Sequence, residues 1–381
     1  MTETIPLSEP SLEGNELAYL DDAIGQRHLS ALGEYSRKCS ELLGAAHGAA
    51  DVVMTTSCTD ALELSALLLG IEPGDVVVVP SFTYVSTALA FARQGATIRF
   101  CDIEPVTFGM DPNHLEALLD GSVRAVVPVH YAGVGCDIED ILNATQGLPH
   151  LDVVEDNAHG LFGSYRGEPL GSFGRFSTLS FHETKNFVCG EGGALVVNRP
   201  GDVERARILN DKGTNRGAFL RGQVDRHTWV DTGSSFGLSD MLAAFLYGQL
   251  ERRSEILAKR KVVFERYQVM LEGGQRDGGY SLPVVPEDRR SAYHMYYVIL
   301  PDRATRDAVI DGMRVRGVAS AFHYVPLHSS PYGLEVSDGD GECPVTDDVA
   351  GRLLRLPFYN NLSESQADRV VEAFLAALAA C

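Results

Sequence analysis

The stretch that decides the fold runs from Asp152 to Val197 and reads DVVEDNAHGLFGSYRGEPLGSFGRFSTLSFHETKNFVCGEGGALVV. It opens with a β-branched run that ends in two acids. A glycine-rich segment follows, then further strand-like runs at 178–181 and 194–197. Asp156 and Lys185 lie just past the ends of the first two runs. In open α/β sheets, ligands bind at the edge formed by the carboxyl ends of the strands. We therefore expect Asp156 and Lys185 to face one ligand.

A lone acid and a lone lysine at such an edge suit pyridoxal phosphate. The aldehyde of this cofactor forms a Schiff base with an amine, and a carboxylate keeps its pyridine nitrogen protonated so that the ring can accept electrons. Lys185 and Asp156 have the required chemistry. The alternative is a solvated charge and a turn residue, since short motif matches often arise by chance. The spacing alone leaves both interpretations open.

Composition narrows the class of protein. A chain of 381 residues is long enough for a large core and two domains. A net charge of −20 argues against nucleic acid or an anionic membrane surface as the main partner. The seven cysteines are scattered without a CxxC pair, which favours a reduced, cytoplasmic protein without a structural metal site. The acidic N-terminal segment is unlike a signal peptide, and no apolar run reaches the roughly 18 residues of a membrane span.

In the middle of the chain, segments with the sequence pattern of strands alternate with segments that have the spacing of helices. Strands are expected at 52–55, 76–80, 97–102, 124–129 and 152–155, and helices at 59–69, 84–94, 112–119 and 138–146. Nearly continuous Val and Ile runs between helices indicate strands that are buried on both faces. This pattern predicts the α/β class, with a mostly parallel sheet.

Both ends of the chain differ from this middle part. Helical spacing is present at 17–43, and one long helix is expected from 239 to about 271, after a polar loop at 211–231. A smaller α+β unit follows, with strands at 296–300 and 319–324 and helices at 303–316 and 363–380. We therefore predict a large α/β domain at 1–250, including an N-terminal arm, and a small C-terminal α+β domain at 251–381.

Several polar residues lie where the predicted strands end. Cys58 and Thr59 begin a helix, where free N–H groups and the helix dipole bind phosphate, although small hydroxyl residues there also serve as ordinary N-caps. Ser180 is a candidate second phosphate donor. Tyr84 can stack on a flat cofactor ring or pack in the core. His159, three residues past Asp156, is a candidate partner of the cofactor or an ordinary loop histidine.

A basic segment opposes the acidity of the chain. Residues 205–226 contain six basic residues and only two acids. Because arginine forms bidentate contacts with phosphate, Arg216 and Arg221 are candidates for a clamp on a nucleotide diphosphate; the alternative is a solvated loop. Near the C-terminus, Tyr324 and His328 belong either to the packed core or to a lid over the site.

Ten short motifs mark the chain. Six of them are TSCT at Thr56, PSFTYVST at Pro80, VVEDNAHG at Val153, SFHETKN at Ser180, GEGG at Gly190 and YVPLH at Tyr324. The other four are PVHYAGV at Pro128, DKGTNR at Asp211, RGQVD at Arg221 and GSSFGLSD at Gly233. In combination, the first six resemble the family motifs of the DegT/StrS sugar aminotransferases, and the similarity runs from about Ser8 to the C-terminus. The other four resemble the branch of this family that aminates TDP-4-keto-6-deoxy-D-glucose at C4.

The resemblance implies a fold, a cofactor and an assembly. The fold would be the PLP-dependent transferase type I fold, as in aspartate aminotransferase, with a large mostly parallel-sheet domain and a small C-terminal α+β domain. The cofactor would be pyridoxal phosphate, with pyridoxamine phosphate as its second form. The protein would be a homodimer with shared active sites, and no metal would take part.

The resemblance also implies residue roles. Lys185 would be the Schiff-base lysine and proton carrier, and Asp156 would pair with the pyridine nitrogen. Ser235 stands where many relatives carry an Asn that reaches the phosphate of the partner subunit. The remaining cofactor and catalytic positions would be Cys58, Thr59 and Ser180 around the phosphate, Tyr84 stacked on the ring and His159 near it, and the substrate-binding positions would be Arg216, Arg221, Tyr324 and His328.

The implied reaction is the transfer of an amino group from L-glutamate to a TDP-linked sugar. The product would be TDP-4-amino-4,6-dideoxy-D-galactose. The alternatives are amination at C3, another nucleotide keto-sugar, or a non-catalytic regulator that binds pyridoxal phosphate. Lys185 argues against the dehydratase branch of the family, which carries His there. A nicotinamide-dependent oxidoreductase is disfavoured because no G-x-G-x-x-G follows the first strand.

Overall fold

A seven-stranded sheet organises the molecule in the computed structural model, which describes residues 4–276, 279–339 and 341–381. The strand order is β1-β9-β8-β5-β4-β2-β3, and β9 alone runs antiparallel to its neighbours. This central sheet confirms the predicted α/β class with a mostly parallel sheet. Its strands are β1 (Asp51–Thr55), β2 (Val76–Pro80), β3 (Thr97–Cys101), β4 (Val123–Val126), β5 (Asp152–Asp156), β8 (Phe176–Ser180) and β9 (Gly193–Val197).

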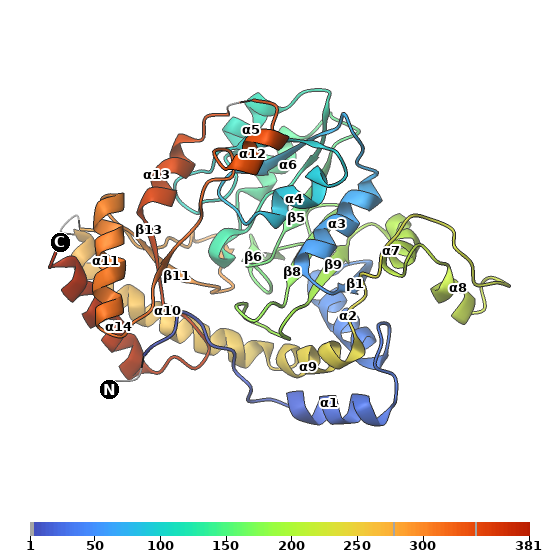
Figure 1. Cartoon of the computed structure of the whole chain (residues 1–381), viewed down its shortest axis with the longest axis horizontal. Coiled ribbons are helices and arrows are strands. Elements are labelled where there is room, and N and C mark those ends of the chain that lie inside the picture. Colours follow the sequence, from blue (N-terminus) through green and yellow to red (C-terminus); the bar gives the residue numbers. More distant parts are fainter. Residues whose placement is uncertain (1–3, 277–278, 340) are drawn as a thin grey trace.

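Helices cover both faces of the central sheet (Figure 1). Because side chains alternate along a strand, Val77 and Val79 pack with α3 and α4, whereas Val76 and Val78 pack on the opposite face with α5 and α6. The helices in this part of the chain are α1 (Glu16–Gly25), α2 (Glu34–His47), α3 (Cys58–Leu69), α4 (Ser86–Ala92), α5 (Pro112–Leu118), α6 (Ile138–Ala144), α7 (Val203–Asn210), α8 (Arg216–Leu220) and α9 (Asp240–Leu250).

A second, smaller sheet lies in the C-terminal part of the chain. This C-terminal sheet has the order β11-β13-β12 and a separate core with α10, α11 and α14. A third sheet, of order β10-β6-β7, is built from two-residue strands. The bounds are β6 (Ser164–Tyr165), β7 (Glu168–Pro169), β10 (Arg289–Arg290), β11 (Tyr296–Ile299), β12 (Ala321–Phe322), β13 (Leu353–Leu356), α10 (Arg253–Arg276), α11 (Arg303–Val315), α12 (Pro331–Val336), α13 (Pro344–Arg352) and α14 (Glu364–Leu378).

Long-range contacts join the two ends of the chain. Ile5 pairs with Val318 and lies in the core of the C-terminal sheet, so the N-terminal arm runs beside the C-terminal helices (Figure 1). Ser337, just after α12, pairs with Ile98 of the central sheet. The division of the chain into domains at residue 250 stays a prediction.

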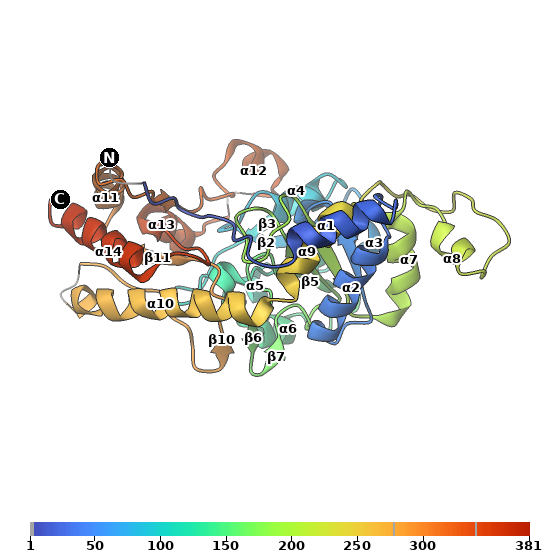
Figure 2. The same cartoon turned by 90° about the horizontal axis from the view of Figure 1, so that it is seen from below.

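Three of the predicted elements differ from the structure. The helical spacing at 17–43 belongs to two helices, α1 and α2, separated by a turn in which Arg27 and Leu32 have positive φ. The long helix from 239 is likewise two helices, α9 and α10, which meet at residues 251–252 (Figure 1). The polar loop after Asp211 contains the short helix α8 and projects from the body of the molecule (Figures 1 and 2).

Candidate active site

A cavity of about 730 Å³ lies where the parallel strands of the central sheet end. Asp156 is the last residue of β5 and Ser180 the last of β8, while Cys58 and Tyr84 follow β1 and β2. Lys185 enters the same cavity from the loop after β8. This is the sheet edge at which α/β proteins bind ligands. Of the sequence-predicted residues, Cys58, Thr59, Tyr84, Asp156, His159, Ser180, Lys185 and Tyr324 line this cavity.

Asp156 is a buried carboxylate held by polar partners. Its two oxygens accept hydrogen bonds from the Thr87 hydroxyl at 2.7 Å and from the Ala158 N–H at 3.2 Å. Burial raises the pKa of the Asp156 carboxyl. The hydrogen bonds from Thr87 and Ala158 oppose this shift, as do the positive charges of Lys185 and His130. A carboxylate in this setting is poised to accept a proton-bearing nitrogen of a ligand.

A buried ion pair lies behind Asp156. The Glu155 carboxylate accepts N–H groups from Gly171 at 2.8 Å and Gly174 at 2.7 Å, and it lies 2.8 Å from Nε2 of His130. Burial by itself would lower the pKa of His130, but Cys136 and Glu155 outweigh it and the pKa is raised. The charged imidazole then supports the negative charge of Asp156.

Lys185 supplies an amine with a lowered proton affinity. Burial, assisted by the charge of Arg355, lowers the pKa of its ammonium group to about 8, while Cys58 and Asp156 act in the opposite direction. A lysine that titrates near neutrality is a nucleophile and can accept or donate a proton at physiological pH. These properties suit an amine that forms and releases a covalent bond to a carbonyl group.

The start of α3 forms a cradle for an anion. Ser57 caps this 12-residue helix by accepting the N–H of Asp60 at 3.0 Å, and the Thr59 hydroxyl lies 2.8 Å from that of Ser86. A Cβ added to Gly193 would lie 2.3 Å from the carbonyl carbon of Ser57, so only glycine allows β9 to approach this loop. Free N–H groups and the helix dipole favour a phosphate here.

Histidines and tyrosines also line the cavity. The rings of His159 and His294 stack with centroids 4.2 Å apart, and Nδ1 of His159 is buried without a hydrogen-bond partner. Burial lowers the pKa of both histidines well below the usual value, so both rings are neutral. The exposed fraction of Tyr84 is 61%, which leaves its ring free to stack on a ligand.

These features fit pyridoxal phosphate. The α3 cradle suits its phosphate, Asp156 its ring nitrogen and Lys185 its aldehyde. The orphaned Nδ1 of His159 is available to a polar group on the ring. Among the described residues, no group of three or more His, Cys, Asp or Glu side chains is placed to hold a metal ion.

Four predicted residues lie outside this cavity. Ser235 pairs with Asp211 in the projecting loop. Arg216 begins α8 in the same loop, and the Arg221 side chain forms an ion pair with Glu204. His328 lies 2.7 Å from the Ser81 hydroxyl, which ties the segment after Tyr324 to the end of β2. Within one described chain, these residues therefore do not meet Lys185.

Sequence reasoning missed three residues that surround Lys185 and Asp156. Thr87, in α4, binds the Asp156 carboxylate, and His294 stacks on His159. Arg355, from β13, also lines the cavity. His294 and Arg355 are each a single polar residue within an apolar run, and Thr87 is the last residue of the family motif PSFTYVST. These signals did not suffice, because nothing in the sequence placed the three segments beside β5.

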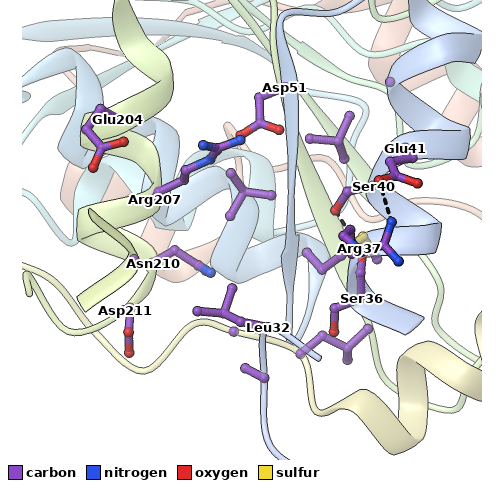
Figure 3. A pocket seen from close by; sticks show the side chains of 18 of the residues that line it. Leu32, Ser36, Arg37, Ser40, Glu41, Asp51, Glu204, Arg207, Asn210 and Asp211 are labelled. Carbon is purple, nitrogen blue, oxygen red and sulfur yellow. Dashed lines mark hydrogen bonds and ion pairs between the residues drawn. The ribbon is translucent and has the colours of Figure 1, made fainter. Parts of the chain in front are cut away.

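A second cavity, of about 770 Å³, lies between α2, β1 and α7 (Figure 3). Its described lining includes neither Lys185 nor Asp156. The basic side chains around it already pair with acids, which leaves little charge for a ligand. The pairs are Arg37–Glu41 at 2.7 Å, Arg207–Asp51 at 2.8 Å and Arg221–Glu204 at 2.8 Å.

The described chain contains no helix that is both long and apolar enough to cross a bilayer. A bilayer-spanning protein of the helical kind needs about 20 consecutive apolar residues in one helix. The longest described helix, α10, carries charged side chains throughout its length.

Known proteins resemble this chain over nearly its whole length. Residues 10–375 match the model of the DegT/DnrJ/EryC1/StrS aminotransferase family. The chain is 30% identical over 380 residues to the spore coat polysaccharide biosynthesis protein SpsC of Bacillus subtilis, with 97% of this chain and 96% of SpsC covered. It is 31% identical over 372 residues to GDP-perosamine synthase of Caulobacter vibrioides, with 97% of each chain covered.

Solved structures share the same fold. The structure of the aminotransferase TlmJ from Streptoalloteichus hindustanus superimposes with a TM-score of 0.91 at 30% identity, and 99% of each chain is covered. The predicted α/β architecture, the PLP-dependent transferase type I fold, is thereby confirmed.

Proposed function

Because the chain belongs to the DegT/DnrJ/EryC1/StrS aminotransferase family, we propose that it aminates C4 of a nucleotide-linked 4-keto-6-deoxy sugar. The amino donor is L-glutamate and the acceptor is TDP-4-keto-6-deoxy-D-glucose. The products are 2-oxoglutarate and TDP-4-amino-4,6-dideoxy-D-galactose. The observation that carries the proposal is the meeting of the Lys185 amine and the Asp156 carboxylate in one cavity at the ends of the sheet strands.

The aminotransferases of this family use pyridoxal phosphate, and the residues of the cavity fit this cofactor. When bound, the cofactor supplies an aldehyde that captures an amine and a ring that accepts the electrons of a broken C–H bond. The start of α3, with Cys58 and Thr59, would hold the phosphate, together with Ser180, since all three residues line the cavity. Asp156 would hold the ring nitrogen in its protonated form, and Tyr84 and His159 would bind the ring.

Lys185 performs the proton transfers. Its pKa of about 8 means that the free amine and the ammonium ion are both accessible near neutrality. The amine takes the proton from the α-carbon of glutamate in the first half of the reaction. In the second half, the ammonium ion delivers a proton to C4 of the sugar. One side chain can serve both halves because it lies beside the reacting carbon in each.

In this proposal, the side chains that bind the nucleotide come from a second protomer. Arg216 and Arg221 lie in the projecting loop, and neither lines the cavity that holds the Lys185 of their own chain. The same loop exposes large apolar side chains, such as Leu220 and Trp229. We propose a homodimer in which this loop and Ser235 reach the cavity of the partner, where the arginines bind the diphosphate. Tyr324 and His328 then close the sugar end of the site.

We propose that the enzyme works in the cytoplasm. All seven of its cysteines are free thiols, and five of them are buried. Buried thiols persist in a reducing compartment, where disulfides are rare. The nucleotide-linked substrate is also made of highly charged groups that do not cross membranes unaided.

A second candidate acceptor is the GDP-linked 4-keto-6-deoxy sugar. The observation that favours it is the 31% identity to GDP-perosamine synthase over almost the whole chain. Another alternative is an aminotransferase of the same fold that acts at C3 of a nucleotide-linked keto-sugar. The lowered pKa of the Lys185 amine disfavours a non-catalytic regulator, because a regulator does not need an amine that titrates near neutrality.

The experiment that tests the acceptor compares nucleotide sugars directly. Purified protein with L-glutamate is incubated with TDP-linked and GDP-linked 4-keto sugars and with a 3-keto sugar, and each product is identified by mass and by NMR. We expect amination at C4 of the TDP-sugar, with galacto configuration. A product aminated at C3, or turnover of the GDP-sugar alone, would replace the proposed acceptor.

A further inference from the structure

The second cavity, between α2, β1 and α7, contains polar groups that the fold leaves without partners (Figure 3). Asn210 is the last residue of α7, Asp211 follows it, and both line the cavity. Their exposed fractions are only 2% and 8%. Oδ1 of Asn210 and Oδ2 of Asp211 are buried, and neither accepts a hydrogen bond from the residues that the structure describes. Buried acceptors of this kind are costly unless a donor reaches them, which points to a ligand that carries N–H groups.

The charged side chains of this cavity favour a cation over an anion. Its described lining contains three arginines and four acids. Each of the three arginines already forms an ion pair with one of the acids. The fourth acid, Asp211, contacts the Lys212 ammonium at 2.6 Å through Oδ1, and Lys212 is not part of the described lining. The cavity therefore offers a ligand a carboxylate oxygen, and each arginine of its lining is already neutralised.

Apolar side chains form much of the remaining wall. Ile208 and Leu238 are part of it, and so are Leu32 and Leu220. The last two are unusually exposed for leucines, with exposed fractions of 52% and 68%. A ligand with an apolar body would cover both side chains and remove apolar surface from water. The volume of about 770 Å³ suits a small molecule, because ligand cavities typically measure about 300–1,000 Å³.

We propose that this cavity binds a small organic cation with an apolar body and an N–H-bearing head, such as an amine, an amidine or a guanidine. The head donates hydrogen bonds to Oδ2 of Asp211 and Oδ1 of Asn210, and the body covers Leu32 and Leu220. Hydrogen bonds from a cation to a carboxylate are about twice as strong as neutral ones. No described residue lines both this cavity and that of Lys185, so the proposal does not depend on the reaction that Lys185 performs.

The proposed ligand also contacts the projecting loop. Thr214 and Leu220 line the cavity from this loop, and Thr214 pairs with Trp229. Trp229 is the only tryptophan of the chain. Its fluorescence therefore reports a ligand that settles against the loop, without any measurement of enzymatic activity.

The test uses benzamidine, an apolar ring with an amidinium head, and the protein supplied with pyridoxal phosphate. Benzamide is nearly the same shape but neutral, and benzoate is an anion of similar size. Calorimetry measures the dissociation constant of each probe, and the emission of Trp229 gives a second reading. Benzamidine is then measured with Asp211→Asn, which removes the charge at the head, and with Ala45→Trp, which fills the cavity from the exposed face of α2. Asp225→Asn, an exposed acid of the same loop outside the lining, is the matched control.

We expect the unaltered protein to bind benzamidine at least about tenfold more tightly than benzamide or benzoate, with a change in Trp229 emission. Asp211→Asn should weaken benzamidine about 10- to 100-fold, because it replaces a charge-assisted contact by a neutral one. Ala45→Trp should weaken it by a similar factor, because the indole occupies the space of the ligand. Asp225→Asn should stay within about twofold of the unaltered protein, because exposed charges interact weakly.

Three results would overturn the proposal. The first is no binding of benzamidine at about 10 mM, which is ten times a millimolar dissociation constant. The second is benzoate that binds as tightly as benzamidine. The third is benzamidine binding that Ala45→Trp leaves unchanged, since the probe would then occupy another place, such as the cavity of Asp156. If Asp211→Asn does not fold, Ala45→Trp, which leaves Asp211 in place, decides the question with the three probes.

Discussion

Burial disfavours the charged form of both Lys185 and Asp156. This serves the chemistry of the lysine, whereas at Asp156 the hydrogen bonds from Thr87 and Ala158 and the nearby positive charges oppose it. Burial lowers the pKa of the lysine to about 8 and raises that of the aspartate. The residue types at these two positions were predictable from the sequence, because each follows a strand-like run. The groups that tune them were not predictable, since Thr87 and Arg355 come from segments 69 or more residues away from Asp156.

Asp156→Asn should lower kcat while leaving the fold intact. The amide oxygen of asparagine can still accept the N–H of Ala158, and its NH2 group can donate to the Thr87 hydroxyl, but the side chain carries no charge to hold a protonated ring nitrogen. Removing one such electrostatic contact typically costs about 10²- to 10³-fold in kcat. Steady-state kinetics, with the visible cofactor band as the control for binding, measure this loss. A kcat within a few-fold of the unaltered protein would exclude the proposed role of Asp156.

Lys185→Met should stabilise the protein without cofactor at neutral pH. The folded pKa of about 8 lies below the ordinary value of 10.5, so the unfolded chain binds the extra proton between these values. The cost of the buried ammonium, at most about 3 kcal/mol, is full below pH 8 and fades as the pH rises toward 10.5. Denaturant midpoints of both proteins, measured at neutral pH and near pH 10, check this. A gain that is the same at both pH values would contradict it.

At the scale of elements, strands were predicted better than the ends of helices. The apolar run of β2 is buried on both faces, and its pattern is visible locally. The break before α2 depends instead on Asp240, which accepts the N–H groups of Tyr35 and Ser36 from more than 200 residues away. A Cβ on Gly33 would lie 2.3 Å from that carboxylate. Such a cap cannot be recognised in a local window of sequence.

The junction of α9 and α10 has a similar cause. Glu251, between the two helices, accepts hydrogen bonds from Asn15 at 2.7 Å and from Tyr19 at 2.8 Å. Arg252 forms an ion pair with Glu13 at 3.1 Å. The N-terminal arm thus holds the point at which the predicted single helix is interrupted. The nearest glycine in the sequence, Gly248, lies within α9 and not at the interruption.

Gly193→Ala should loosen the phosphate cradle at the start of α3. The new methyl group would lie 2.3 Å from the carbonyl carbon of Ser57 and 2.4 Å from the nitrogen of Cys58, so the loop must move. Overpacking of this kind costs about 1–3 kcal/mol, and cofactor affinity should fall at least tenfold. Gly201→Ala, whose added Cβ meets nothing within 4 Å, is the matched control. Equal cofactor dissociation constants for the two variants would rule out the cradle.

At the scale of the whole molecule, the projecting loop is the feature that a single chain leaves unexplained. It carries Arg216, Arg221 and the exposed Trp229 and projects from the body of the molecule (Figure 1), and none of these three residues lines the Lys185 cavity of its own chain. The basic composition of this segment was visible in the sequence, whereas its projection from the body was not. A shared site in a homodimer accounts for both properties.

Two inactive variants should restore activity when they are mixed. If the arginines of one protomer serve the cavity of its partner, a dimer of Lys185→Ala with Arg216→Gln/Arg221→Gln contains one intact site. Random exchange of subunits then gives about a quarter of the full activity. Activity after mild dissociation and reassociation measures this, and each variant alone is the control. Recovery that stays at the level of the separate variants would place the arginines in their own cavity.

The most direct test of the central claim is the visible absorbance of the purified protein during the two half-reactions. Addition of L-glutamate should bleach the band of the cofactor bound to Lys185, and TDP-4-keto-6-deoxy-D-glucose should then restore it. Lys185→Ala should bind the cofactor without either change. A band that glutamate bleaches but the keto-sugar does not restore would reject this acceptor and keep the aminotransferase. A protein that takes up no pyridoxal phosphate at all would contradict the account.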